Sequence, residues 1–336
     1  MITGVERRTI VTGFGAAALL ASAGRPARAQ AKIRLRYGTA FPSDHPGAKR
    51  ITEAATAIAA DTNGQVDLQV YPNSQLGGEP DMFSQTRSGA LDFMSTSGVN
   101  QTVVPVGGIN AVAFAFPSYN EVWAAMDGDL GNFVRAQFDK VGLHVMPKML
   151  DNGYRNITTG ARAVAAPADL KGLKIRVPGN QLWVTLFSAL GAAPTSINFG
   201  ELYAALQTHV VDGQENPLAL IDSAKLYEVQ KYVSVTGHIW DGHFIFSNAK
   251  RWNALSADVR DVLTKRLSDA AMAERDDIKT LNVELAEKLK KAGLQFETPD
   301  KAPFRAALAA SGFYADWKKR FGDEPWGLLE KHTGSL

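Results

Sequence analysis

One arginine in this sequence is placed where it could bind a carboxylate. Arg176 lies in residues 171–179 (KGLKIRVPG), where the apolar run 173–177 predicts a short strand ended by Pro178 and Gly179. A guanidinium held at a strand end presents a rigid fork of N–H donors that matches the two oxygens of a carboxylate. A lone arginine at such a position more often forms an exposed ion pair, so the rest of the sequence must decide.

A second polar segment follows further along the chain. Residues 211–217 (VDGQENP) form a predicted turn dense in hydrogen-bonding groups, with Asn216 directly before Pro217. An asparagine in a turn is more often a turn residue than a ligand contact. Together with Arg176, however, this segment points to a site for a small organic acid.

Enzyme signatures are missing from the sequence. It contains no G-x-S-x-G, no H-E-x-x-H, no P-loop and no G-x-G-x-x-G after a strand. His238, Asp241 and His243 could be drawn as a metal or catalytic cluster, but a spacing of five on a strand places the two histidines on opposite faces. We therefore expect these three residues to have hydrogen-bonding or packing roles. For the protein as a whole we expect ligand binding without turnover, with no catalytic residues, no metal and no cofactor.

The N-terminus predicts export. Arg7 and Arg8 precede an apolar run over 10–23, and Ala27-Arg28-Ala29 is an A-x-A cleavage pattern, so residues 1–29 are expected to be a signal peptide. The paired arginines fit a twin-arginine signal loosely, and Sec export stays open. Both routes predict a periplasmic protein.

The composition excludes several classes of protein. Removing residues 1–29 takes away four arginines and one glutamate, which leaves 32 basic against 33 acidic residues, a net charge of −1. No basic surface then argues for nucleic acid as a partner. The absence of cysteine excludes disulfides, thiol catalysis and cysteine-bound metal, so an ordinary core must stabilise the fold.

The predicted elements that would position these residues follow an α/β pattern. Alternating or apolar runs predict strands, and amphipathic runs ended by glycine predict helices. Two units of similar order result: strands 33–37, 66–71 and 91–94 with helices 48–61 and 80–88, then strands 143–146 and 173–177 with helices 181–190 and 200–208. The order predicts mostly parallel, helix-covered sheets in two lobes, with the ligand site in the cleft between them.

A long helix is expected near the C-terminus. Residues 257–292 contain neither glycine nor proline, Ser256 is a candidate N-cap and Gly293 a candidate stop. Thirty-six helical residues extend about 54 Å, longer than the roughly 30–40 Å of one domain of this size. We expect this helix to span both lobes; two helices with a bend near Asp276 and Asp277 are the alternative.

Several motifs in this order resemble one known family. They are Tyr71-Pro-Asn-Ser-Gln-Leu-Gly77, Gly89-Ala-Leu-Asp-Phe93, Gly172-Leu-Lys-Ile-Arg-Val-Pro178, Phe199-Gly-Glu-Leu-Tyr-Ala-Ala-Leu-Gln207, Val211-Asp-Gly-Gln-Glu-Asn-Pro217 and Tyr227-Glu-Val-Gln-Lys-Tyr232. The chain thereby resembles the DctP-type solute-binding proteins of tripartite ATP-independent periplasmic (TRAP) transporters over nearly all its mature length.

The resemblance implies a fold and a function. The fold is a two-lobed α/β clamshell with mixed sheets flanked by helices: lobe I from 31–153 plus about 242–281, lobe II from 154–241 plus about 282–336, and the helix 257–292 across both. The function is capture of a small organic acid and its delivery to the membrane permease of a TRAP transporter. A periplasmic ligand sensor, or an enzyme on the same scaffold, is the alternative.

The resemblance also implies site residues. Arg176 would form a two-point ion pair with the ligand carboxylate, assisted by Arg155, Asn216 and Phe199. The positions near the ligand that vary within the family would include Glu79, Ser97, Asn100, Trp183, His238 and Trp240.

Departures from the family bear on the substrate. Members that bind sialic acid carry Glu and Arg where this chain has Ser97 and Asn100, and an Asn where it has Ala40. We therefore expect another acid: a hydroxy or keto monocarboxylate, a sugar acid or an aromatic acid.

Overall fold

A computed structural model describes residues 32–336, which form one compact unit. The expected signal peptide at 1–29 lies outside the described residues. The strands are β1 (Ile33–Thr39), β2 (Val66–Tyr71), β3 (Phe93–Thr96), β4 (Leu143–Val145), β5 (Leu150–Thr159), β6 (Lys174–Val177), β7 (Ala193–Ser196), β8 (Gly213–Asn216), β9 (Tyr232–Asn248) and β10 (Gln295–Glu297).

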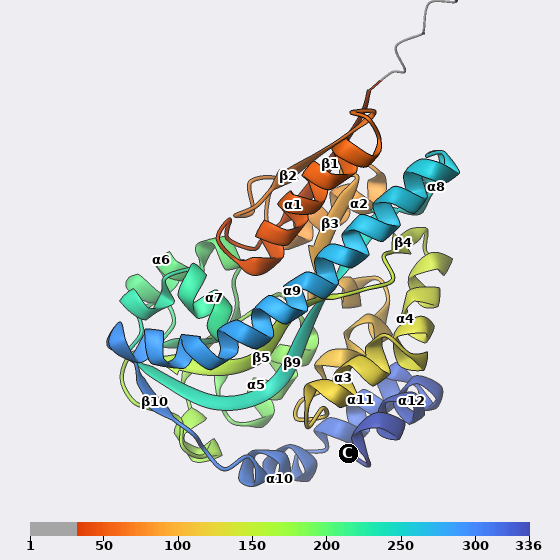
Figure 1. Ribbon diagram of the computed structural model, residues 1–336. Coiled ribbons are helices and arrows are strands. Elements are labelled where there is room, and N and C mark those ends of the chain that lie inside the picture. Colours follow the sequence, from red (N-terminus) through yellow and green to blue (C-terminus); the bar gives the residue numbers. More distant parts are fainter. Residues whose placement is uncertain (1–31) are drawn as a thin grey trace, which may run out of the picture. The chain divides into compact units, whose positions relative to one another are not determined.

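Helices cover these strands (Figure 1). The α-helices are α1 (Pro46–Asp61), α2 (Glu79–Ser88), α3 (Tyr119–Met126), α4 (Asp129–Lys140), α5 (Gln181–Ala189), α6 (Leu202–Gln207), α7 (Leu218–Ser223), α8 (Ala249–Asn253), α9 (Ala257–Lys291), α10 (Ala302–Ala310), α11 (Phe313–Phe321) and α12 (Asp323–Thr333). Short 3₁₀ turns are η1 (Val99–Thr102), η2 (Pro105–Ala111), η3 (Pro167–Leu170), η4 (Phe199–Glu201) and η5 (Leu226–Glu228). Within residues 32–336, no helix is long and apolar enough to cross a membrane.

The sheet combines two parallel groups of strands. The order is β2-β1-β3-β9-β5-β8-β6-β7, with β4 and β10 also paired to β9. The groups β2-β1-β3 and β8-β6-β7 are parallel, as their strand–helix order predicts. The central pairings of β9 with β3, β4 and β5, and of β5 with β8, are antiparallel. The sheet is therefore mixed rather than mostly parallel.

Two local predictions from sequence were wrong. The segment 211–217, predicted to be a polar turn, contains the fully buried strand β8. Its polar side chains are tolerated inside because Arg155 of the neighbouring strand β5 donates to Glu215, and Thr158 of β5 accepts from the Gln214 amide. The strand predicted at 91–94 begins two residues later, at Phe93.

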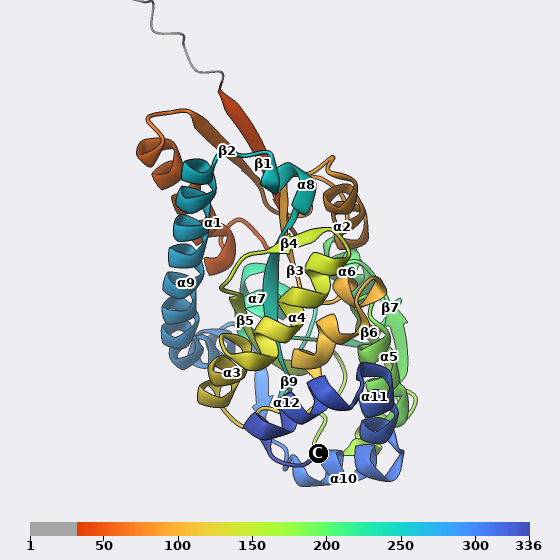
Figure 2. The same cartoon turned by 90° about the vertical axis from the view of Figure 1, so that its right-hand side faces the viewer.

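The helix predicted at 257–292 is one continuous helix, α9, from Ala257 to Lys291, without a break near Asp276 and Asp277. Figure 2 shows it along one side of the molecule, beside α1. Its first half, including Leu263 and Leu267, packs in a hydrophobic core with β1 and α1. Its second half, including Ile278 and Leu285, packs in a separate core with α6 and α7. One helix thus links two cores; the lobe boundaries given above stay a prediction.

Two carboxyl groups are buried where α9 crosses β5. Glu274 of α9 accepts a hydrogen bond from the backbone N–H of Asp151 at 2.7 Å through Oε2, while its Oε1 has no partner. The Asp151 side chain accepts from the Trp240 indole at 2.9 Å. Burial, together with the charge of Asp151, raises the pKa of Glu274 well above its usual value, and burial raises the pKa of Asp151 to about 7.

This pair predicts a pH dependence of stability. A carboxyl group whose pKa is higher folded than unfolded stabilises the fold fully below its unfolded pKa, and that stability is lost as the pH rises through the folded pKa. We expect the melting temperature to fall between pH 5 and pH 8, and to fall less in Glu274→Gln. The matched control is Glu284→Gln at an exposed position of α9. An equal fall of the melting temperature with pH in Glu274→Gln and in the wild type would contradict the raised pKa of Glu274.

Candidate functional site

The ends of parallel strands from both groups converge on one pocket. Ala40 and Phe41 follow β1, Ser97 and Gly98 follow β3, Pro178 follows β6, and Asn216 ends β8. Loops at the carboxyl ends of parallel strands are the usual ligand-binding region of α/β sheets.

Strands β5 and β9 cross between these two sets of ends. Thr96 at the end of β3 pairs with Phe244, and Arg155 of β5 pairs with Ile239, so the intervening part of β9 lies between the groups. A register shift between Asp151 and Gly153 adds one residue to β5, and Gly153 adopts a positive φ of 101°. Such an irregularity re-aims side chains, and here Asn152 lines the pocket.

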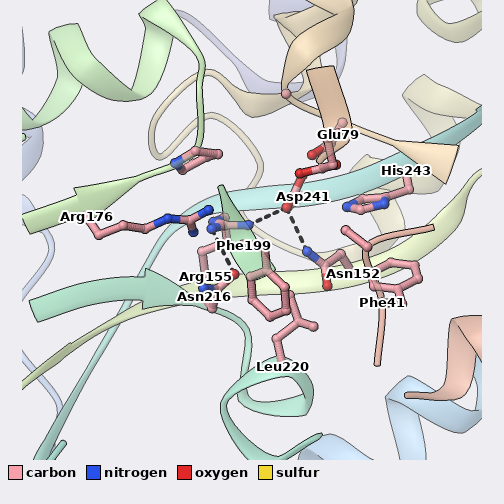
Figure 3. A pocket seen from close by; sticks show the side chains of 14 residues that line it. Phe41, Glu79, Asn152, Arg155, Arg176, Phe199, Asn216, Leu220, Asp241 and His243 are labelled. Atoms are coloured by element: carbon pink, nitrogen blue, oxygen red, sulfur yellow. Dashed lines mark hydrogen bonds and ion pairs between the residues drawn. The ribbon is translucent and has the colours of Figure 1, made fainter. Parts of the chain in front are cut away.

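Eight of the fourteen residues that line the pocket are polar or charged, and the other six are apolar residues or glycine (Figure 3). The empty space of the pocket, including the part open to solvent, is about 390 Å³. It is lined by Ala40, Phe41, Glu79, Ser97, Gly98, Asn152, Arg155, Arg176, Pro178, Phe199, Asn216, Leu220, Asp241 and His243.

Arg176 has an unusual environment. Its side chain is only 2% exposed, and the structure gives it one hydrogen bond, from Nε to the Ile197 carbonyl at 2.8 Å. Its guanidinium carbon lies 5.9 Å from the ring centre of Phe199. Burial, followed by the positive charge of Arg155, lowers the pKa of Arg176 to about 10, so the side chain is charged at neutral pH. No carboxylate within residues 32–336 forms a salt bridge with it.

Arg155, by contrast, forms most of its hydrogen bonds with the protein itself. It donates to both carboxylate oxygens of Glu215, at 2.5 and 2.7 Å, and to Asp241 Oδ2 at 2.5 Å. It also donates to the Glu215 carbonyl and to Asn216 Oδ1. A guanidinium has five N–H groups, and these contacts leave one at Nη1. Burial opposes the charge of Arg155, but Glu215 and Asp241 outweigh it, and the pKa of Arg155 is raised.

Two further side chains, His238 and Trp183, contact the Glu215 carboxylate. His238 Nε2 lies 3.1 Å from Glu215 Oε2, and the Trp183 indole donates to the same oxygen at 3.3 Å. Burial works to raise the pKa of Glu215, but the charge of Arg155 and the hydrogen bond with His238 outweigh it, so the pKa is lowered. Burial also lowers the pKa of His238. A charged carboxylate beside a charged guanidinium is therefore the stable arrangement.

Six of the ten predicted site residues line the pocket: Arg176, Arg155, Asn216, Phe199, Glu79 and Ser97. Four do not. Trp183 and His238 contact Glu215, Trp240 donates to Asp151 and packs edge-on against Trp123, and Asn100 donates to the Gly107 carbonyl. A ligand-binding role for any of the ten stays a prediction.

Sequence reasoning did not assign the pocket residues Asp241, Asn152, His243, Phe41 and Leu220 to a ligand site. Asp241 and His243 were noticed only as a possible cluster with His238. Their spacing of two on one strand places both on one face, and that signal could have grouped them toward the pocket. His238 lies against Glu215 instead, and no group of His, Asp or Glu within residues 32–336 is arranged to hold a metal.

Comparison with known proteins identifies the family. Residues 37–316 match the DctP family, described as "Bacterial extracellular solute-binding protein, family 7". The chain belongs to this family. The resemblance of its motifs to the DctP type is thereby confirmed, and the family and its relatives are substrate-binding proteins of transporters rather than enzymes.

Three relatives show the range of similarity to this DctP-family protein. The 2,3-diketo-L-gulonate-binding periplasmic protein of Escherichia coli K12 is 31% identical over 280 residues, covering 82% of this chain and 84% of the relative. A TRAP periplasmic solute-binding protein from Polaromonas sp. JS666, solved bound to D-erythronate, is 30% identical with a TM-score of 0.85, over 91% of this chain and 100% of that one. A Sinorhizobium fredii protein is 42% identical over 221 residues, which cover 65% of this chain and 40% of the length of the relative.

The paired charges around Arg155 predict a large effect on stability. Replacing Arg155 by Met leaves Glu215 and Asp241 buried without a countercharge, so we expect the free energy of unfolding to fall by about 3–5 kcal/mol. Urea unfolding of the unliganded protein measures this. The control is Arg266→Met, which removes a partly exposed pair with Asp61 and should cost at most about 1 kcal/mol. Similar losses in the free energy of unfolding of both variants would contradict a special role of Arg155 in balancing buried charges.

Proposed function

We propose that this DctP-family protein binds a small organic acid in the periplasm through Arg176 and delivers it to the membrane permease of a TRAP transporter. The observation that carries the proposal is the guanidinium of Arg176, which is 2% exposed in the pocket and has no carboxylate partner within residues 32–336. A buried charge is costly unless it is paired, and a ligand carboxylate would supply the partner.

The surroundings of Arg176 support a carboxylate rather than a neutral group. Its Nε is fixed by the Ile197 carbonyl, which leaves the two terminal nitrogens for a two-oxygen acceptor. Phe199 packs near the guanidinium and excludes water, which strengthens an ion pair. Arg155 and Asn216 already bond to the protein and each other, so we assign them a supporting role: one Arg155 N–H and one Asn216 N–H remain for the ligand.

The relatives support an acid as ligand. One is named for 2,3-diketo-L-gulonate binding and another was solved with D-erythronate; both ligands are carboxylic acids. Periplasmic location follows from the family type and the export signal expected at 1–29. Cleavage after Ala29, closure of the two predicted lobes around the acid, and delivery to a permease all belong to this proposal.

Loss of the guanidinium should abolish tight binding. A thermal-shift screen of organic acids identifies a binder, because a ligand selective for the folded state raises the melting temperature. For the best acid, calorimetry of Arg176→Ala should show binding weakened by about 2–5 kcal/mol, since the carboxylate loses its buried partner. Arg162→Ala, at an exposed arginine, is the control and should bind normally. Unchanged affinity in Arg176→Ala would show that the acid binds elsewhere.

The unliganded protein gives an independent check. Because Arg176 is buried without a carboxylate, Arg176→Met should not destabilise the protein. Its free energy of unfolding should lie no more than about 1 kcal/mol below that of the wild type, and it can exceed it. This is the opposite of the loss expected for Arg155→Met. Urea unfolding without ligand compares the two, and a loss of about 3 kcal/mol in Arg176→Met would assign Arg176 a structural role.

A further inference from the structure

Two buried oxygens in the pocket lack a hydrogen-bond donor. Asp241 Oδ1 and Asn152 Oδ1 are both shielded from solvent, and neither has a partner in the structure. Both residues line the pocket that contains Arg176. Buried polar atoms are almost always paired, so two unpaired acceptors in one binding pocket point to a ligand that donates hydrogen bonds.

The orientation of Asp241 is fixed by its other oxygen. Asp241 Oδ2 accepts from Arg155 at 2.5 Å and from the Asn152 amide nitrogen at 2.8 Å. Burial works to raise the pKa of Asp241, but the charge of Arg155 outweighs it and the pKa is lowered, so the group is an ionised acceptor. The Ser97 hydroxyl, which also lines the pocket, is near enough to Asp241 to lower its pKa as a hydrogen-bond donor, but its geometry does not form a hydrogen bond with Oδ1.

The orientation of the Asn152 amide follows from the same contact. Its nitrogen donates to Asp241 Oδ2, and the reverse orientation would place its oxygen against a carboxylate oxygen. The Asn152 oxygen is therefore an acceptor, like the Asp241 oxygen beside it. Glu79, at the start of α2, adds a third acceptor group, whose Oε1 is held by the Thr96 hydroxyl at 2.6 Å.

Asp241, Asn152 and Glu79 together form what we call the acceptor wall. Figure 3 shows these side chains on the side of the pocket away from the point where Arg176 enters. The two ends of the pocket thus differ in chemistry: Arg176 offers donors and positive charge, and the acceptor wall offers oxygens and negative charge. A complementary ligand carries a carboxylate at one end and hydrogen-bond donors along the rest.

We propose that the ligand is a monocarboxylic acid with several hydroxyl groups, and that Asp241 is the residue that selects it. This inference rests on the proposed function, because it requires the carboxylate to bind Arg176. Hydroxyl groups donate to the acceptor wall. A second carboxylate is disfavoured because it would face the negative charges of Asp241 and Glu79, and the charge of Arg155 beside them is already balanced by Glu215 and Asp241. Aliphatic and aromatic acids leave the buried oxygens unpaired.

Acids of equal chain length test the proposal. The four-carbon set is D-erythronate, butyrate and succinate, and the six-carbon set is D-galactonate, hexanoate and adipate. Calorimetry should show the best hydroxy acid bound at least about 100-fold tighter than the unsubstituted acid and the dicarboxylate of the same length, because hydrogen bonds to a charged acceptor each contribute roughly tenfold or more.

Two variants locate the selectivity. Asp241→Asn keeps the shape and removes the charge, and the preference for the hydroxy acid over the dicarboxylate should fall about tenfold or more. Glu79→Gln repeats the test without altering the ion pairs of Arg155, and should lower the same preference if Asp241→Asn fails to fold. Asp127→Asn is the control: it removes a carboxylate paired with Arg275 outside the pocket and should leave selectivity unchanged.

The outcomes separate this inference from the proposed function. Tight binding of butyrate or succinate that disappears in Arg176→Ala would overturn the inference and support the acid site. Binding of none of the six acids would overturn the inference, and the proposed function would fall with it if the thermal-shift screen also found no acid whose binding requires Arg176. Selectivity for hydroxy acids that is unchanged in both Asp241→Asn and Glu79→Gln would overturn the role of the acceptor wall.

Discussion

Arg155 joins the three central strands at the point where the two parallel groups meet. From β5 it reaches Glu215 and Asn216 on β8 and Asp241 on β9. Its charge keeps two buried carboxylates ionised, and its geometry fixes which of their oxygens remain available. Asp241, which lines the pocket, therefore keeps one oxygen without a hydrogen bond, and Glu215 is held by Arg155, His238 and Trp183. The composition of the pocket depends on this pairing.

This arrangement divides the two arginines of the pocket into different roles. Arg155 is paired with two carboxylates of the protein, whereas Arg176 is buried without a carboxylate partner within residues 32–336. The uncompensated guanidinium is unfavourable for the isolated protein, and such a cost is typical of a site shaped for a ligand rather than for stability. The surrounding fold, including a 35-residue helix packed into two hydrophobic cores, supplies the stability that tolerates it.

The sequence allowed the parallel strand groups, the long helix and the importance of the strand that carries Arg176 to be predicted, because each depends on local periodicity or on a motif; the structure places Arg176 in the pocket, and its ligand-binding role stays a prediction. It did not predict β8 as a strand, since Gln214, Glu215 and Asn216 resemble a turn until their partners on β5 are known. The position of Asn152 in the pocket wall depends on a register shift in β5, and the orientation of Asp241 depends on a contact with Arg155, 86 residues away in sequence. Pairings across strands are set by tertiary structure, so a pocket wall assembled from them is not visible in local patterns.

The burial of Arg176 also has a consequence for the timing of exchange. A side chain that is 2% exposed cannot meet an acid arriving from solution unless the pocket first opens. Under the proposed function, entry and exit of the ligand would be limited by how often the pocket opens, and differences in affinity between acids should appear mainly as differences in residence time. Slow opening of the pocket would then retain the ligand together with the ion pair to Arg176.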